Sequence, residues 1–295
     1  MTENKKPPTK KKPAPKKSKD VIIFDHARVD SSHCLTDGLF RPLSRVPSKE
    51  CLDVTHTFMG YTLRWLNYCK LNIVDQSVFL AIHRLGAEEG RIERVGDEHE
   101  SPVMKEVRAA LKLEKDAIKS DCLVLDTTLY EIAKTIGVTD GGENLKMIRN
   151  SLIKLSCVSF LIYKGNNIGD TFFKSGLFSK LAGTDGRIHV GINPMLGKAL
   201  AGNQSIFVNM AEQRCLKSDI TKRLHVWLSS WMRAGDNRKI EIDKLVPHIW
   251  GENPEPETVR KRRHSIRKAI IELNSLSSWI ASEKDGYIEL RRKKL

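Results

Sequence analysis

The stretch ETVRKRRHSIRKAI, residues 257–270, decides how the C-terminal part of this chain folds, because it combines a dense run of cations with regularly spaced apolar residues. At 100° per residue, Val259, Ile266 and Ile270 fall on one side of a helix, and Leu273 just beyond the stretch joins them. A merely solvated charge run would not keep one side free of charge. The sequence therefore predicts an amphipathic helix with a core side.

The other side of this helix is basic. Like charges on one face repel each other by about 0.2 to 0.5 kcal/mol per i,i+4 pair, so the face needs an acidic partner or counterions. For an isolated run, a solvated face that aids solubility would be the expected role. Ile271 falls on the basic side, and packing under a neighbouring hairpin would account for it. The cations of that side are Arg260, Lys261, His264, Arg267 and Lys268.

The flanking segments give the basic helix a context. Before it come a long helix over 218–232, a brief strand at 239–242 and a short helix over 243–251. After it, WIASE (279–283) and YIELRRKK (287–294) enclose an Asp-Gly turn, which is typical of a hairpin. Helix, short helix, second helix and hairpin is the order of a winged helix-turn-helix domain, in which the second helix enters the major groove of DNA.

The same order occurs earlier in the chain. TLYEIAKTIGV (128–138) predicts a short amphipathic helix, and a second helix follows over 143–156. VSFLIY (158–163) and TFFKSGLF (171–178) then form a hairpin with a polar tip. Two occurrences of one order are much less expected by chance than one. The predicted fold class is α+β, with two tandem winged helix-turn-helix domains and a disordered basic N-terminal tail.

The predicted domains are a Lys/Pro-rich tail over 1–25, an N-terminal winged-helix domain over 26–203 and a C-terminal one over 204–295. The first twenty residues hold eight lysines and almost nothing apolar, so they cannot offset the entropy of ordering. Residues 86–104 are rich in Gly and Glu and lack a clear period, which indicates a surface loop.

The charge of the chain points to an acidic partner. Its net charge is +14, and the residues after the first twenty still carry +8. This favours nucleic acid first and an anionic membrane surface second. Because no stretch approaches the roughly eighteen apolar residues of a membrane span and the N-terminus lacks a secretory signal, a cytoplasmic protein is expected.

Signals of catalysis and of cofactors are missing from the sequence. There is no GxxxxGK[ST] loop for phosphates and no HxH or HExxH cluster for a metal. The six cysteines are scattered without a CxxC, which predicts reduced, mostly buried thiols. We therefore expect no enzymatic activity, no catalytic residue, no metal, no cofactor, no small-molecule substrate and no membrane partner.

Several segments resemble one family, the RepC replication initiators of IncQ-type plasmids. They are HARVDSSHCLTDGLFRPL (26–43), LDVT (52–55), DGRIHVGINPMLGKAL (185–200), RLHVWLSSW (223–231) and VRKRRHSIRKAIIEL (259–273). The resemblance implies binding of iterons, short direct repeats in the plasmid origin, as double-stranded DNA. It also implies origin opening, recruitment of a separately encoded plasmid replicative helicase, and two recognition helices at 143–156 and 257–273.

The expected DNA contacts fall on the two second helices and the two hairpin tips. Arg260 and Arg267 are expected to contact bases, and Lys268 to contact phosphate. The C-terminal helix contributes Arg260, Lys261, Arg262, Arg263, His264, Arg267 and Lys268. The N-terminal helix contributes Lys146, Arg149, Asn150 and Lys154, and the tips contribute Lys164, Asn166, Asn167 and Lys284.

Three alternatives stay open at the level of sequence. A winged-helix transcriptional regulator would use the same binding chemistry. A DNA-nicking initiator enzyme would need one of the tyrosines as nucleophile. The lysine-rich tail would also suit binding to an anionic membrane surface. Whether the protein self-associates is left open as well.

Overall fold

The computed structural model describes residues 25–43, 50–58, 60–182, 186–196, 205–251 and 256–294. The predicted tail lies outside these residues except for Asp25. Its carboxylate accepts a hydrogen bond from Arg84 Nε at 2.8 Å and another from Arg214. The folded body therefore includes the last residue assigned to the tail.

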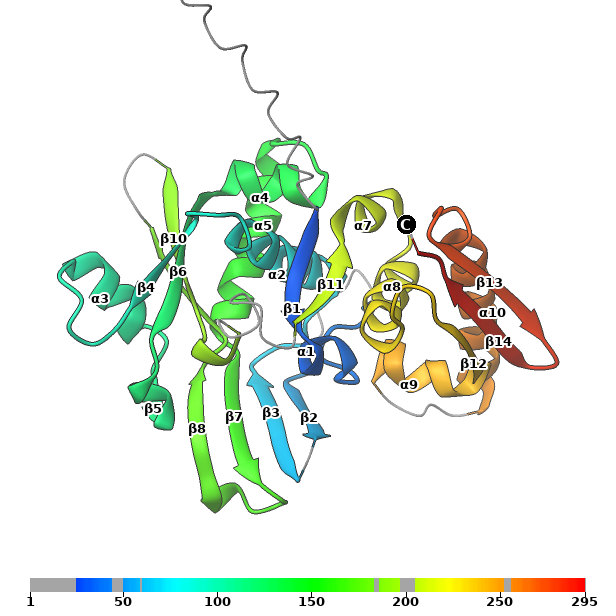
Figure 1. The fold of residues 1–295 in the computed structure, drawn as a ribbon, viewed down its shortest axis with the longest axis horizontal. Coiled ribbons are helices and arrows are strands. Elements are labelled where there is room, and N and C mark those ends of the chain that lie inside the picture. The colour runs from blue at the N-terminus through cyan, green and yellow to red at the C-terminus, as the bar shows by residue number, and fades with distance from the viewer. Residues whose placement is uncertain are drawn as a thin grey trace, which may run out of the picture.

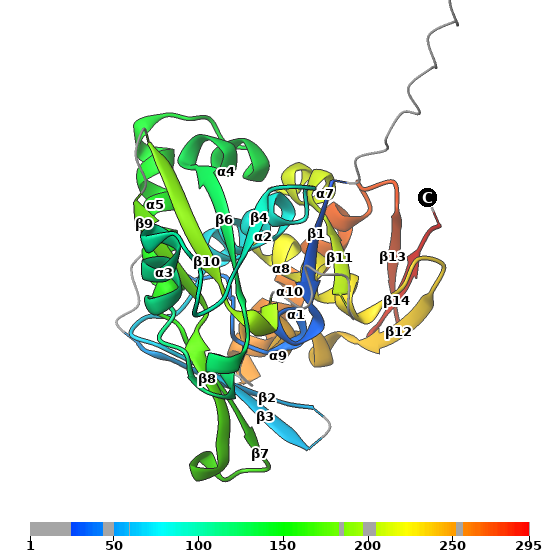
Figure 2. The same ribbon diagram turned by 60° about the vertical axis from the view of Figure 1, so that its left-hand side comes forward.

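The larger of two main hydrophobic cores lies among three helices, a five-stranded antiparallel sheet and a second, four-stranded sheet (Figure 1). The helices are α2 (Ile73–Gly86), α4 (Leu129–Ile136) and α5 (Gly142–Ser156). In sheet order the strands are β2 (Leu52–Phe58), β3 (Tyr61–Asn67), β7 (Ser159–Lys164), β8 (Thr171–Gly176) and β5 (Glu114–Lys115). The β2–β3 and β7–β8 hairpins project together at the bottom of both ribbon views (Figures 1 and 2).

Capping interactions fix the ends of α4, the first of the two helices that precede the β7–β8 hairpin. Thr128 and Glu131 form a reciprocal capping box at the start of α4, which satisfies two otherwise free N–H groups. Gly137 ends the helix with a φ of 81°, a left-handed conformation that glycine adopts without strain. The predicted order of short helix, second helix and hairpin is confirmed here.

A four-stranded antiparallel sheet packs beside this unit. Its strands, in order, are β4 (Ile92–Val95), β6 (Cys122–Thr128), β10 (Arg187–Ile192) and β9 (Phe178–Ala182). The helix α3 (Pro102–Ala109) covers part of this sheet. Two 3-10 turns complete the unit: η1 (Asp116–Lys119) precedes β6, and η2 (Ile168–Asp170) precedes β8.

The predicted surface loop over 86–104 is therefore wrong in part. Ile92 pairs with Leu125 of β6, and Val95 is fully buried against Val107 of α3 in a small third core. This pairing partner lies about thirty residues away, so no local period in the segment announces the strand.

The C-terminal unit surrounds the second main core. Its elements are α8 (Asp219–Trp231), β12 (Asn237–Glu241), the 3-10 turn η3 (Ile242–Lys244), α9 (Leu245–Trp250), α10 (Pro256–Leu273), β13 (Trp279–Lys284) and β14 (Tyr287–Arg292). The three strands form an antiparallel sheet in the order β12-β14-β13. The predicted order of helix, strand, short helix, second helix and hairpin is confirmed.

A two-stranded sheet lies between the two units in both ribbon views (Figures 1 and 2). It pairs β1 (His26–Asp30) with β11 (Ser205–Asn209) and is flanked by α1 (Ser31–Leu35) and α7 (Met210–Cys215). The domain boundary between residues 203 and 204 stays a prediction. Strand β1, which lies before this boundary in the chain, pairs with β11, which lies after it.

A buried arginine joins the units at this junction. Arg223 of α8 is fully buried and donates to the carbonyl oxygens of Cys34, Thr36 and His248 at 2.9, 3.0 and 3.1 Å. His248 also contacts Asp37 through Nδ1 at 2.7 Å. The two hydrogen bonds from Arg223 to Cys34 and Thr36, and the contact between His248 and Asp37, thus hold α1 and its following turn on the C-terminal unit, while the bond to His248 ties α8 to α9.

Two smaller findings complete the fold. The thiols of Cys51, Cys157 and Cys215 are exposed, so the expectation of mostly buried cysteines is wrong for these three. Cys34 and Cys122 are buried as expected, and burial raises the pKa of the Cys34 thiol to about 12. Within the described ranges, no helix is long and apolar enough to cross a membrane.

Candidate nucleic-acid interface

The helix α10 divides its residues as the sequence predicts. Ile266, Ile270 and Leu273 are at most 5% exposed and lie in the C-terminal core. Arg260 and His264 are exposed on the opposite side. The apolar side packs against α8 and β13, so the basic side faces solvent.

Two arginines of α10 are held by carboxylates from neighbouring elements. Arg263 forms a bidentate ion pair with Asp243 of η3, in which both nitrogen–oxygen distances are 2.5 Å. Arg267 makes the same kind of contact with Glu283 of β13 at 2.7 and 2.8 Å. These hydrogen bonds lower the pKa of both carboxyl groups. Because such bonds fix the plane of a guanidinium, the two arginines have defined orientations before any partner binds.

Two further cations of the helix are engaged less tightly. Lys261 contacts Glu257 at 3.0 Å one turn earlier, and both side chains are largely exposed. Exposed pairs of this kind contribute about 0.3 to 0.5 kcal/mol and yield readily to a stronger partner. Arg262 lies over the ring of Trp250 in α9, with 5.0 Å between the guanidinium carbon and the ring centroid. Arg262 therefore borders the core side rather than the centre of the exposed face.

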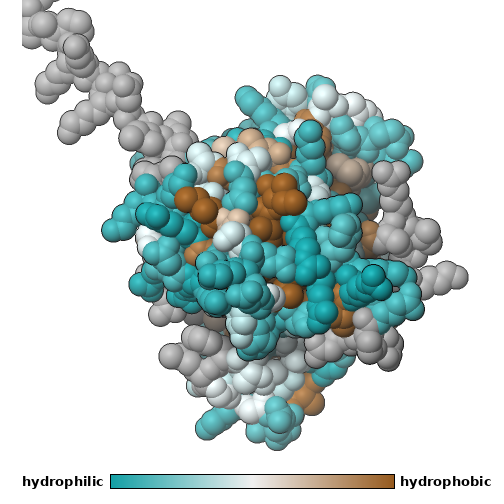
Figure 3. Space-filling view, turned by 90° about the vertical axis from the view of Figure 1, so that its right-hand side faces the viewer, coloured by the Kyte–Doolittle hydropathy of each residue, from teal (hydrophilic) through white to brown (hydrophobic). Residues whose placement is uncertain are grey.

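The remaining cations of α10 are free to meet a partner. Arg260, His264 and Lys268 are exposed, and among the described residues none of them has an ion-pair partner. We call these three residues, together with the clamped Arg267, the α10 cationic face. Figure 3 shows that hydrophilic side chains dominate this end of the molecule, interrupted by separate hydrophobic patches.

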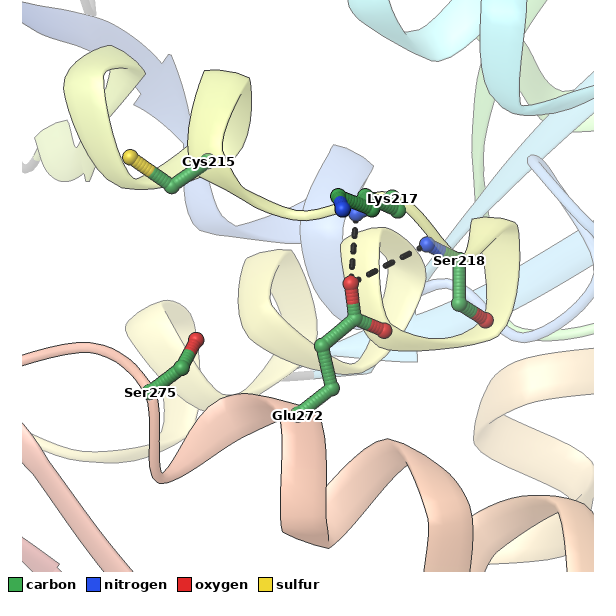
Figure 4. Close-up of a pocket in the computed structure, with 5 residues that line it drawn as sticks. All are labelled: Cys215, Lys217, Ser218, Glu272 and Ser275. Atoms are coloured by element: carbon green, nitrogen blue, oxygen red, sulfur yellow. Dashed lines mark hydrogen bonds between the residues drawn. The ribbon is translucent and has the colours of Figure 1, made fainter.

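The C-terminal end of α10 is anchored through Glu272, which lies in a surface pocket (Figure 4). Its Oε1 accepts from the backbone N–H groups of Lys217 and Ser218 at 2.5 and 3.2 Å, and its Oε2 accepts from Thr221 Oγ1 at 2.6 Å. The carboxylate thus satisfies N–H groups at the start of α8, where the helix dipole also favours a negative charge. The pKa of Glu272 is lowered, because these hydrogen bonds outweigh its partial burial. Glu272 therefore fixes the end of α10 on the start of α8.

In the N-terminal unit, α5 presents a similar but sparser face. Lys146, Arg149 and Asn150 are exposed on one side of it. Lys154, which the sequence assigns to DNA, instead contacts the fully buried carboxylate of Asp75 in α2 at 3.3 Å. A buried charge needs such a partner, so Lys154 holds α5 on α2.

One cation near α5 escapes the sequence-based prediction. Lys180 of β9 is half-buried, and its pKa is lowered by burial and by the nearby charge of Arg149. The strand packs against α5, which brings Lys180 beside the face of that helix. This proximity comes from packing between α5 and β9, about thirty residues apart in the chain, so a local pattern could not have found it.

The four residues assigned to hairpin tips lie where the sequence places them. Lys164 ends β7, Asn166 and Asn167 follow in the turn, and Lys284 ends β13. Asn167 has a local role, since its Oδ1 accepts from the N–H of Gly169 at 3.0 Å. That bond closes the turn, and Lys164, Asn166 and Asn167 are all exposed at the tip.

A family model described as replication protein C (RepC) matches residues 22–294. The chain belongs to the RepC family. The match spans both helix-and-hairpin units, including the α10 cationic face and α5. No curated protein matches the chain.

Among solved structures, this RepC chain is similar to domains 2 and 3 of RctB. One crystal structure, of selenomethionine derivatives, gives a TM-score of 0.57 at 10% identity and covers 90% of this chain and 99% of that one. Another gives a TM-score of 0.51 at 11% identity and covers 90% and 97%. At such identities the likeness concerns the fold: an α+β arrangement shared along nearly the whole of both chains.

Proposed function

We propose that this RepC-family protein is a plasmid replication initiator of the IncQ type, which binds origin iterons as double-stranded DNA and is not an enzyme. The observation that carries the proposal is the α10 cationic face. It lies opposite a packed apolar side, on a helix fixed at Asp243, at Glu283 and at the start of α8. An α-helix fits the major groove, and arginine bonds there to guanine or to phosphate.

The C-terminal unit supports a winged helix-turn-helix domain in this proposal. Its helices α8, α9 and α10 precede the β13–β14 hairpin, and β12 completes the sheet beside β14. In that arrangement α10 is the recognition helix and the hairpin is the wing. Lys284 at the hairpin tip then lies along the DNA backbone.

The N-terminal unit supports a second such domain with a modified wing. Its helices α2, α4 and α5 precede the β7–β8 hairpin, but this hairpin joins β3 and β2 in a larger sheet, and β6 pairs elsewhere. Helix α5 is the second recognition helix, with Lys146, Arg149 and Asn150 toward the groove and Lys180 toward phosphate. Origin opening and helicase recruitment rest on the family resemblance alone, and self-association stays open.

Binding to origin DNA tests this proposal directly. The purified protein is titrated onto a labelled origin fragment and onto a scrambled fragment of equal composition. Arg260→Ala should cost about 1 to 3 kcal/mol on the origin fragment if it contacts a base, and Lys268→Ala should weaken both fragments equally. Arg94→Ala is the matched control, since Arg94 is exposed on β4, far from α10 in Figure 1.

The salt dependence of binding adds a second readout. Each phosphate interaction that a substitution removes should reduce the slope of log K against log salt by about one. Affinity and slope unchanged by both Arg260→Ala and Lys268→Ala would refute the assignment of α10 as a recognition helix.

The two alternative functions need their own tests. Cleaved or covalently attached DNA after incubation with a divalent metal would instead favour the nicking alternative. An origin-dependent replication assay with purified helicase separates an initiator from a regulator.

A further inference from the structure

An exposed isoleucine continues the α10 cationic face. The side chain of Ile271 is 73% exposed, the highest value among the large hydrophobic residues that the structure describes as exposed. Packing under the hairpin, which the sequence suggests, is therefore wrong. The hairpin instead contacts Asn274, the residue that follows α10, whose side chain exchanges two hydrogen bonds of 2.7 Å with the backbone of Ala281.

The neighbours of Ile271 on the helix surface are cations. Residues three and four positions apart share a helix face, so Ile271 adjoins Lys268 and Arg267. Arg267 is fixed by Glu283 and cannot fold over the isoleucine without breaking that ion pair. An apolar side chain thus stands in the open between two positive charges.

The other candidate recognition helix repeats this arrangement. Lys146, Arg149 and Ile153 of α5 have the same spacing as His264, Arg267 and Ile271 of α10. Ile153 is 45% exposed, and like Ile271 it lies in the last turn of its helix. Of the described residues on these two helices, Ile153 and Ile271 are the only exposed large hydrophobics.

We propose that Ile271, and Ile153 in the same position on α5, contact the 5-methyl groups of thymine in the major groove. The inference rests on the proposed function, in which both helices enter that groove. There phosphates line the rims, and the thymine methyl is the apolar group that a side chain meets on the base edges. Cations flanked by an isoleucine match this combination of charge and apolar surface.

A protein partner fits the same surface less well. Covering Ile271 with an apolar protein surface would also remove water from Lys268, which has no ion-pair partner among the described residues, and a charge buried without a partner is costly. DNA supplies phosphates for this cation and a methyl group for the isoleucine at the same time. The contact is therefore assigned to DNA.

Replacing thymine by deoxyuridine tests the proposal, because uracil lacks only the 5-methyl group. The origin fragment is amplified once with thymidine and once with deoxyuridine triphosphate, and binding of both duplexes is titrated at one salt concentration. The wild-type protein should bind the uracil duplex about fourfold more weakly for each thymine methyl that an isoleucine covers. Ile271→Ser, which has nearly the same helix propensity, should weaken thymine binding and reduce this discrimination.

The matched control is Ile280→Ser. Ile280 is 44% exposed on β13, and because Trp279 and Ala281 on either side of it point into the core, its side chain lies on the sheet face away from α10. This variant should keep the wild-type preference for thymine. Ile153→Ser should behave as Ile271→Ser does, and circular dichroism melts confirm that each variant is folded.

The outcomes separate this inference from the function on which it rests. If wild-type protein binds origin and scrambled DNA equally, the proposed function itself fails. If it prefers the origin but does not distinguish thymine from uracil, or if Ile271→Ser and Ile153→Ser both keep the full distinction, only the methyl contact is refuted. If Ile271→Ser loses a self-association that the wild-type protein shows in sedimentation but keeps the preference for thymine, Ile271 belongs to a protein interface and the methyl contact is refuted.

Discussion

Replacement of Arg223 by methionine should separate the two units of the molecule. Methionine has a similar length and keeps apolar packing, but it removes the guanidinium that donates to Cys34, Thr36 and His248. Three carbonyl groups at the junction are then left without a donor. The arginine is fully buried, so solvent cannot replace it without opening the junction.

The size of the effect follows from two opposing contributions. A buried carbonyl left without a donor costs about 1 to 3 kcal/mol, and three of them are affected. Against this, the variant no longer buries a charge, whose desolvation costs several kcal/mol. Burial indeed lowers the pKa of Arg223, which shows the direction of this cost. The three carbonyls together cost about 3 to 9 kcal/mol, so after the regained desolvation energy the net loss of unfolding free energy should be about 1 to 5 kcal/mol.

Urea denaturation followed by tryptophan fluorescence and by circular dichroism measures this loss. Arg291→Met is the control, because Arg291 is exposed on β14 and a surface substitution should change stability by less than about 0.5 kcal/mol. Two separate transitions in Arg223→Met, in place of one, would show that the units have been uncoupled. A loss below about 1 kcal/mol would refute the view that this side chain holds the junction.

Three other predictions concern the ion pair between Arg267 and Glu283, the junction between the units and stability in acid. Glu283→Gln releases Arg267 and removes a negative charge beside the cationic face, so DNA titrations should show tighter binding to all sequences, a steeper salt slope and a smaller preference for the origin. Gly251→Ala combines a φ of 79° with a methyl group 2.3 Å from the Cα of Gly38, and should destabilise by about 2 kcal/mol or more in urea. Gly286→Ala, with the same φ and open space, should cost only about 1 kcal/mol. Burial lowers the pKa of His83 to about 4, so its contribution to stability is present above pH 6.5 and is lost as the pH falls toward 4. At pH 4.5 the loss of unfolding free energy should be about 2 to 3 kcal/mol. In His83→Phe, the free energy of unfolding measured in urea should depend less on pH between 6.5 and 4 than in the wild type.

The elements that the sequence predicts are those with a strong local signal. Helix α10 was expected over 257–273 and spans Pro256–Leu273, because its apolar residues repeat at the helical period. Helix α5 was expected over 143–156 and spans Gly142–Ser156 for the same reason. Both hairpins follow from alternating strands around polar turns.

The parts that could not be predicted depend on residues far apart in the chain. The β1–β11 pair joins His26 to Asn209, and such pairings leave no local period. The partners of Arg263 and Arg267 lie on η3 and β13, so sequence shows the cations of α10 but not the carboxylates that hold two of them. Likewise, helical spacing placed Ile271 on the basic side, but only the packed structure shows that nothing covers it.

These carboxylates bear on how α10 would select a sequence. Asp243 and Glu283 stand beside the cationic face, so part of its positive charge is cancelled before DNA arrives. In the proposed complex, phosphates would gain less from such a face than from the same cations without neighbouring carboxylates, which would lower affinity for DNA of any sequence. A rigid Arg267 and an exposed Ile271, by contrast, gain only where the base edges match them. Weakening the sequence-independent attraction while keeping the base contacts increases the ratio between specific and non-specific binding, and that ratio decides whether an initiator finds its origin among competing DNA.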